Sequence, residues 1–95
     1  MQTNTAIVVE TSETERSLAE IERLTACGVI ERQVERVRKS EGIEAWAAAM
    51  SALKLHVLVY LDGYRAATAE ACSAECSYVA DDIERVLNRL CEVGR

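Results

Sequence analysis

Proline and phenylalanine are absent from these 95 residues, and histidine and tryptophan occur once each. With one histidine, His56, a zinc site built on several histidines is excluded. The sequence also lacks a phosphate-cradling glycine loop, a nucleotide-binding fingerprint and the signature of an activated serine or cysteine. His56 lies in an apolar segment, where a core histidine hydrogen-bonded through one nitrogen is commoner than a catalytic base. We therefore expect no enzyme, no catalytic residue, no metal and no cofactor.

Two further absences limit the surroundings in which the chain works. No apolar run approaches eighteen residues and 28% of the residues are charged, so the sequence predicts no membrane span. The net charge of −5 disfavours nucleic acid, whose phosphates repel a negative protein. The basic residues concentrate in one segment as Arg32, Arg36, Arg38 and Lys39. Because glutamates are interleaved with them, this pattern is typical of a solvated helix face.

No secretory signal is recognisable near the N-terminus. Ala6 to Val9 is too short for the apolar part of such a signal, and no basic residue precedes it. We therefore expect a cytoplasmic protein whose four cysteines are reduced thiols. Cys72 and Cys76 stand four residues apart, which would allow two thiolates to share a metal, but a second close pair of ligands is missing.

The first half of the chain predicts a tail followed by a helix. Residues 1–10 are expected to be flexible or extended, and residues 11–95 to form one helical domain. Thr11 and Ser12 offer N-cap side chains, and Ser12 with Glu15 fits a capping box.

The apolar side of this first helix changes near Gly28. Either one long helix contacts different neighbours along its length, which is slightly favoured, or it stops at Gly28 in a Schellman motif. A clearer end follows at residues 38–42, where two cations precede Gly42.

The stretch from Glu44 to Glu92 carries two seven-residue apolar repeats with steps of four and three. Each repeat forms one helical stripe that must be buried against another helix. The first repeat comprises Trp46, Met50, Leu53, Val57, Tyr60, Tyr64, Ala67, Ala71, Ala74 and Tyr78. The second comprises Ala69, Cys72, Cys76, Val79, Ile83, Val86 and Leu90.

One segment within this stretch, Leu55 to Leu61, is apolar on every side and rich in strand-forming residues. Helix is favoured over strand because no turn residue separates it from the helical pattern before it. As a helix it should be enclosed by neighbours. Gly63 is then expected to kink or end that helix.

These patterns predict an all-α fold, either a helical hairpin or a small helical bundle with coiled-coil-like seams. A chain this short cannot cover every apolar stripe, and burying a Leu or Val contributes about 1.5–3 kcal/mol. We therefore expect a homo-oligomer, a dimer or larger, formed through the second repeat. The candidate self-association residues are Cys72, Cys76, Val79, Ile83, Val86 and Leu90.

The favoured function is a non-enzymatic protein-binding module that acts as an inhibitor or adaptor by occupying a partner protein's surface. Tyr and Arg are common interface anchors, and the acidic cluster in the last helix can imitate nucleic-acid phosphates. One form of this function is a small acidic inhibitor of a nucleic-acid enzyme, of the viral or mobile-element kind. Asp81 is also spaced to pair with Arg85. The candidate partner-binding residues are Tyr64, Arg65, Tyr78, Asp81, Asp82 and Glu84.

The ground plan also resembles the Trp-x-Gly helical hairpins exported by type VII secretion. Gly42 and Trp46 would mark the turn between the helices, and Tyr78 with Asp82 fits their Tyr-x-x-x-Asp signal. The resemblance implies an exported hairpin that pairs with a sister protein. The sequence departs from the family because Trp46 follows Gly42 and does not precede a glycine by two residues.

A third alternative is a small-ligand or metal binder built across an oligomer interface. Tyr64, Arg65 or the cysteines would line its pocket.

Overall fold

The computed structural model describes the backbone of residues 2–71 and 74–92, and the side chains of residues 13–69 and 78–92. Over this range the chain forms four helices: α1 (Gln2–Thr25), α2 (Gly28–Lys39), α3 (Ile43–Ala71) and α4 (Ala74–Glu92). The prediction of a small all-α bundle is confirmed, and the segment from Leu55 to Leu61 is helical. Because the described part has four helices, it is a bundle and not the two-helix hairpin that was the alternative.

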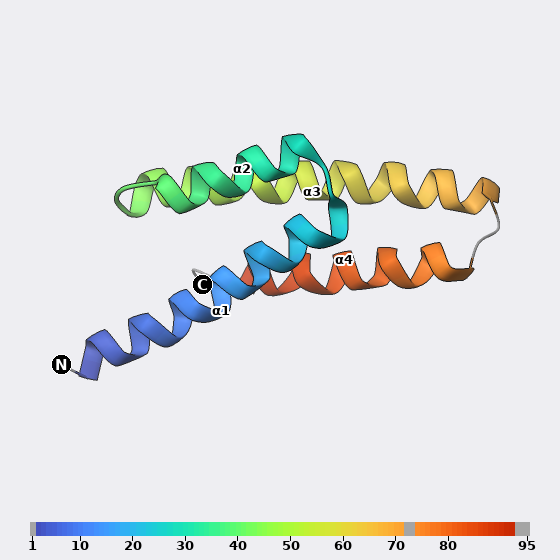
Figure 1. The fold of residues 1–95 in the computed structure, drawn as a ribbon. Coiled ribbons are helices and arrows are strands. Elements are labelled where there is room, and N and C mark those ends of the chain that lie inside the picture. Colours follow the sequence, from blue (N-terminus) through green and yellow to red (C-terminus); the bar gives the residue numbers. More distant parts are fainter. Residues whose placement is uncertain (1, 72–73, 93–95) are drawn as a thin grey trace.

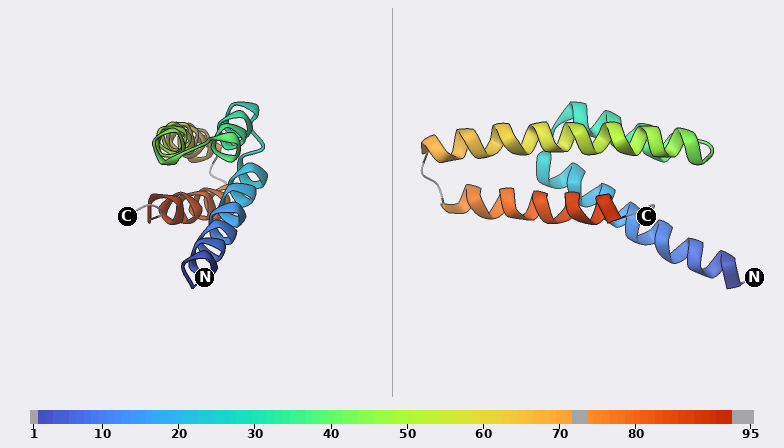
Figure 2. Two further views of the ribbon diagram at one scale, coloured as in Figure 1. Left: turned by 90° about the vertical axis from the view of Figure 1, so that its left-hand side faces the viewer. Right: turned by 180° about the vertical axis from the view of Figure 1, so that it is seen from behind.

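The helices pack around one core in a closed order. α3 contacts both α2 and α4, and α1 contacts α4 extensively and α2 more lightly. Figure 2 shows this arrangement end-on, and Figure 1 shows α1 crossing the others obliquely, with its N-terminal half projecting past the end of α4. The principal extents are 52 × 22 × 20 Å, with a radius of gyration of 14.5 Å against the roughly 12 Å usual for this length. The bundle is therefore elongated.

Every helix contributes apolar side chains to the core. Met50, Leu53 and Val57 of the first repeat are buried, and Trp46, Tyr60 and Tyr64 pack against them half-buried. This part of the predicted stripe is confirmed. The buried apolar residues of the described part are Leu18, Ile21, Ile30, Val34, Val37, Ala49, Met50, Leu53, Val57, Leu61, Ala80, Ile83, Val86, Leu87 and Leu90.

The first helix begins earlier than its capping residues indicated. Residues 2–10 continue α1 as helix, and no strand occurs in the described part of the chain, so the expected extended tail is not seen. A helix can continue through Ala6 to Val9 because β-branched residues lower helix propensity by only a few tenths of a kcal/mol each. No proline or glycine interrupts residues 2–25.

The favoured continuous helix through Gly28 is wrong, and the break comes two residues earlier. Ala26 has a φ of +46°, the left-handed conformation, and its N–H donates to the Glu22 carbonyl at 2.9 Å. Cys27 is extended and Gly28 opens α2, so Gly28 is not the C′ residue of α1. The chain turns on an alanine, a residue that the sequence gives no reason to expect in this conformation.

Replacing Ala26 with glycine is therefore expected to stabilise the protein. Glycine adopts positive φ without steric cost, and this gain exceeds the entropy that glycine adds to the unfolded chain. We expect the free energy of unfolding to rise by about 0.5–1 kcal/mol, measured by urea denaturation. Gly42→Ala is the matched control with the opposite expected effect, a lower free energy of unfolding. Gly42 has a φ of +86° and open space for a Cβ, so the change tests the backbone conformation and not a steric clash. A loss of stability in Ala26→Gly would contradict the assigned turn.

The predicted helix end at residues 38–42 is confirmed. α2 ends at Lys39, the Ser40 N–H and hydroxyl both donate to the Val37 carbonyl, and Gly42 makes the left-handed turn. The first backbone hydrogen bond into α3 runs from the Trp46 N–H to the Gly42 carbonyl at 3.0 Å.

Gly63 does not end the next helix, because α3 continues through it to Ala71. An interior glycine costs a helix about 1 kcal/mol relative to alanine, and burial of neighbouring Leu61 offsets that. Residues 72–73, which include the predicted self-association residue Cys72, lie outside the described part.

Candidate protein-binding face

The predicted acidic partner site is largely paired within the chain. Arg65 Nη2 lies 2.6 Å from Glu84 Oε2 and 3.5 Å from Asp81 Oδ1, which links α3 to α4. The hydrogen bond that Arg65 donates to Glu84 raises the pKa of Arg65. Asp82, not Asp81, pairs with Arg85, which corrects the predicted Asp81–Arg85 pair. Four of the six candidate partner-binding residues, Arg65, Asp81, Asp82 and Glu84, thus form ion pairs within the chain.

The remaining two candidates differ in their exposure. Tyr64 is half-buried and stacks on Tyr60 with ring centroids 6.0 Å apart, while the Tyr60 hydroxyl donates to the Thr25 carbonyl at 3.0 Å. Tyr64 therefore helps to close the core. Tyr78 is 71% exposed on α4.

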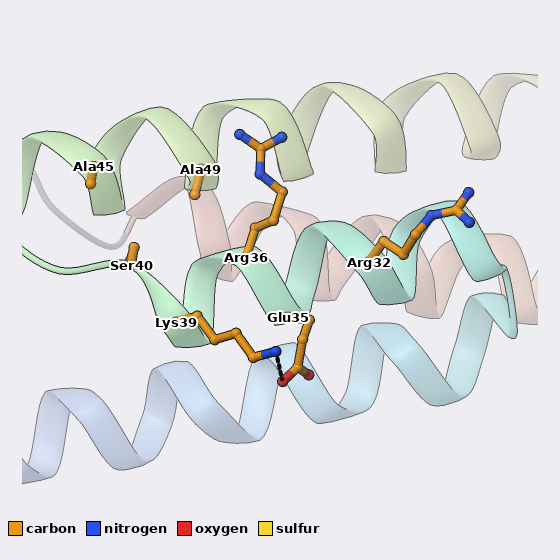
Figure 3. A pocket seen from close by; sticks show the side chains of 7 residues that line it. All are labelled: Arg32, Glu35, Arg36, Lys39, Ser40, Ala45 and Ala49. Carbon is orange, nitrogen blue, oxygen red and sulfur yellow. Dashed lines mark ion pairs between the residues drawn. The ribbon is translucent and has the colours of Figure 1, made fainter.

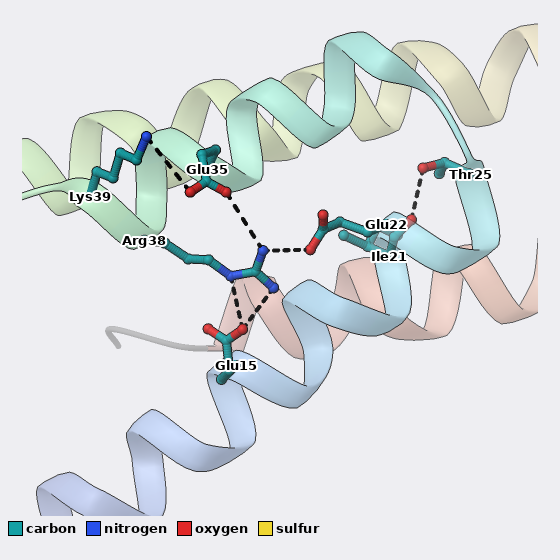
Figure 4. A network of polar contacts seen from close by, with 7 residues as sticks. All are labelled: Glu15, Ile21, Glu22, Thr25, Glu35, Arg38 and Lys39. Carbon is teal, nitrogen blue, oxygen red and sulfur yellow. Dashed lines mark hydrogen bonds and ion pairs between the residues drawn. The ribbon is translucent and has the colours of Figure 1, made fainter.

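A second ion cluster fastens α2 to α1. Arg38 reaches Glu15 Oε1 at 2.7 Å and Glu22 Oε1 at 2.7 Å, with Glu35 at 3.9 Å (Figure 4). The hydrogen bond that Arg38 donates to Glu15 raises the pKa of Arg38, which favours the charged guanidinium. Arg38 thus faces α1, and it shares Glu35 with Lys39.

The described residues of the predicted self-association stripe pack into the core of the single chain. Ile83, Val86 and Leu90 are fully or almost fully buried, and Val79 is half-buried against the same core. The side chain of Cys76, like that of Cys72, lies outside the described part. A second copy would therefore have to bind a different surface.

Three exposed apolar side chains near the middle of α3 form such a surface, separate from exposed Ile43 at the start of the helix. Leu55, Leu58 and Val59 are 60%, 47% and 65% exposed, and they point away from buried Leu53 and Val57. Within the single chain this segment is not enclosed by neighbours as expected, because these three side chains remain exposed although α2 and α4 pack against α3. We call Leu55, Leu58 and Val59 the outer α3 patch.

An apolar hollow of about 380 Å³ adjoins this patch where α2 meets α3. Val29 and Ile30 line it from α2, and Leu55 and Val59 from α3, with Cys27, His56 and Tyr60 completing its wall. His56 Nδ1 lies 2.7 Å from the Ala52 carbonyl, which can only accept, so Nδ1 carries a proton. The predicted hydrogen bond through one nitrogen is confirmed, but His56 is half-buried at the wall of a hollow and not in the core as expected.

A second hollow, of about 540 Å³, lies toward the other end of α2. Arg32, Glu35, Arg36, Lys39 and Ser40 line it from α2 and its end, and Ala45 and Ala49 from α3. In Figure 3, Arg36 extends toward α3 and Lys39 points to Glu35, 3.8 Å away. Within the described side chains, Arg32 makes no ion pair and Arg36 contacts only Gln33 Oε1, at 3.4 Å.

Sequence reasoning missed both hollows. The basic residues were expected to be a uniform solvated face, but Arg38 faces α1 while Arg32, Arg36 and Lys39 border a hollow. The available signal was the run of alanines opening α3, since small side chains leave space beside a neighbouring helix.

The described residues can be compared with the sequence-based expectations for metal and ligand sites. They contain no group of three or more His, Cys, Asp or Glu side chains able to hold a metal ion. Cys27 and Cys91 are free thiols. Neither hollow is lined by Tyr64 or Arg65.

α3 is also long and apolar enough, over Ile43–Ala69, to cross a membrane by length and composition alone. The expectation of no membrane span rests on the absence of an uninterrupted apolar run, whereas this criterion averages over a window that can include charged residues. Only 22% of its most apolar window is buried in the bundle. One such helix is weak grounds for a span, since core helices of soluble proteins meet the same criterion.

Comparison with protein-family models, curated proteins and solved structures finds no match to this chain. The site must therefore be interpreted from its own chemistry.

Proposed function

We propose that this chain is a non-enzymatic protein-binding module, an adaptor or inhibitor that occupies a partner protein's surface with its outer α3 patch. The observation that carries the proposal is the exposure of Leu55, Leu58 and Val59 together, beside an apolar hollow. Adjoining exposed apolar side chains of this size usually mark an interaction site. The partner is another protein in the cytoplasm.

The acidic inhibitor of a nucleic-acid enzyme is the form of this function with the weaker structural support. Arg65 and Arg85 already balance much of the charge of Asp81, Asp82 and Glu84. We therefore assign the main contact to α3 and not to the α4 acidic cluster. Charge reversal at the three carboxylates should leave capture of the partner nearly unchanged, and strong loss of capture would reinstate the acidic mimic.

The proposal is tested by changing one residue of the patch. Leu55→Glu places a charge in the outer α3 patch and is expected to weaken capture of the partner by at least about tenfold, because a charge cannot be buried unpaired in an apolar contact. Helicity should not change, since Leu55 is exposed. Capture is measured by affinity purification from the source cell with quantitative mass spectrometry.

The matched control is Ala67→Glu. Ala67 is exposed on the same helix, but twelve residues from Leu55 it points about 120° away from the patch. The same new charge there should leave capture intact. Equal capture by wild type, Leu55→Glu and Ala67→Glu would show that the patch is not the binding surface.

A further inference from the structure

We propose that the partner segment is an amphipathic helix, acidic at one end and bulky and apolar at the other, which lies along the junction of α2 and α3. This inference rests on the proposed function, because it names the chemistry that the same face recognises. Three observations carry it: the register of the two hollows, their charge and their order along α3.

The two hollows share one stripe of α3. Ala45, Ala49, Ala52, His56 and Val59 follow steps of four, three, four and three, so they lie along one side of the helix. Ala45 and Ala49 line the basic hollow, and His56 and Val59 line the apolar hollow. The stripe is about 21 Å long, which matches about four turns of a bound helix.

The junction suits a helix better than an extended peptide. The described part of the chain has no strand, so it offers no sheet edge to which a partner strand could be added. Ala45 is exposed and Ala52 half-buried on the α3 stripe, and these small side chains allow the backbone of a third helix to approach closely. Helix-in-groove binding of this kind uses anchors on one face of the bound helix.

The charge of the basic hollow selects carboxylates. Arg38, Arg65, Arg85 and Arg89 all have carboxylate partners within the chain, whereas Arg32 and Arg36 have none among the described residues. Arginine binds carboxylates through paired N–H donors, and an acidic segment would supply the missing partners. The three cations that line the basic hollow, Arg32, Arg36 and Lys39, span only about 10 Å of α2. The chain as a whole has a net charge of −5, and both facts disfavour a nucleic acid as the partner.

The order of the hollows sets the direction of the bound helix. The basic hollow lies near the Gly42 turn and the apolar hollow near the Cys27 junction. Acidic residues of the partner therefore lie at the Gly42 end, and a Leu- or Phe-sized side chain fills the hollow at the Cys27 end.

The test uses the full chain and synthetic helical peptides of about 18 residues, labelled with fluorescein. The first peptide carries Glu on one half of a stripe and Leu and Phe on the other half, on an alanine and glutamine background. The second replaces each Glu with Gln. Binding is measured by fluorescence anisotropy at low and high salt.

We expect the Glu peptide to bind at least about tenfold more tightly than the Gln peptide at low salt. Arg32→Gln with Arg36→Gln should abolish that difference, while Val59→Glu should weaken both peptides. Arg16→Gln with Arg23→Gln, which removes two exposed cations from α1, is the matched control and should change neither.

The outcomes separate the two proposals. If Val59→Glu weakens both peptides but Glu and Gln bind equally, the protein-binding face stands and the acidic occupant is wrong. If neither peptide binds, or Val59→Glu has no effect, this occupant is wrong and the face is judged by the Leu55→Glu capture experiment. Tighter binding of an oligonucleotide that depends on Arg32 and Arg36 would replace the acidic helix with nucleic acid. A light-scattering mass of two chains for wild type that falls to one chain in the Arg32→Gln, Arg36→Gln variant would show that the occupant is a second copy of this chain.

Discussion

Leu53→Ala is expected to lower the free energy of unfolding by about 2–5 kcal/mol, whereas Leu55→Ala should change it by less than about 0.5 kcal/mol. Leu53 is fully buried and Leu55 is 60% exposed, although they are two residues apart on α3. Truncating Leu53 loses its burial and leaves a cavity. Because the same change is made in the same helix, the small difference in helix propensity between Leu and Ala is common to both.

Urea denaturation followed by far-ultraviolet circular dichroism measures both values. The midpoint for wild type and Leu55→Ala should not depend on protein concentration if the outer α3 patch is uncovered. Equal losses in the two variants, with a midpoint that rises with concentration, would show that a second copy covers Leu55. That result would contradict the uncovered patch on which the proposed function depends.

The periodic part of the fold could be predicted from the sequence because it is local. The spacing of Met50, Leu53 and Val57 identifies the inward side of α3 without knowledge of its neighbours. The turn at Gly42 was equally visible, since glycine after two cations is a common helix end. The turn at Ala26 was not, because alanine carries no preference for positive φ.

The candidate site was harder to predict because it depends on how distant helices align. The pattern at Leu55, Leu58 and Val59 says that these residues are apolar, but only the positions of α2 and α4 show that they remain exposed. Likewise, Asp81 was paired with Arg85 by spacing along α4, whereas its partner is Arg65 on α3.

The same limit applies to the second apolar repeat, and it leads to a further prediction. A seven-residue repeat requires a helical partner, but it does not say whether that partner belongs to the same chain. In the structure α4 packs its repeat against α1 and α3. Ile83, Val86 and Leu90 of this stripe are therefore covered without a second copy, and their burial no longer argues for one.

Val86→Asp is accordingly expected to unfold the chain and not to release a folded monomer. Val86 is only 2% exposed, and an unpaired carboxylate there costs at least about 3–5 kcal/mol in a domain whose total stability is about 5–15 kcal/mol. Asn88→Asp, two residues along on the exposed side of α4, introduces the same group as a control and should leave helicity unchanged. Circular dichroism and light scattering together measure the result. A Val86→Asp protein that stays helical, unfolds cooperatively and has the mass of one chain where wild type has the mass of two would place this seam between copies, because only an interface could lose its partner and leave the fold intact.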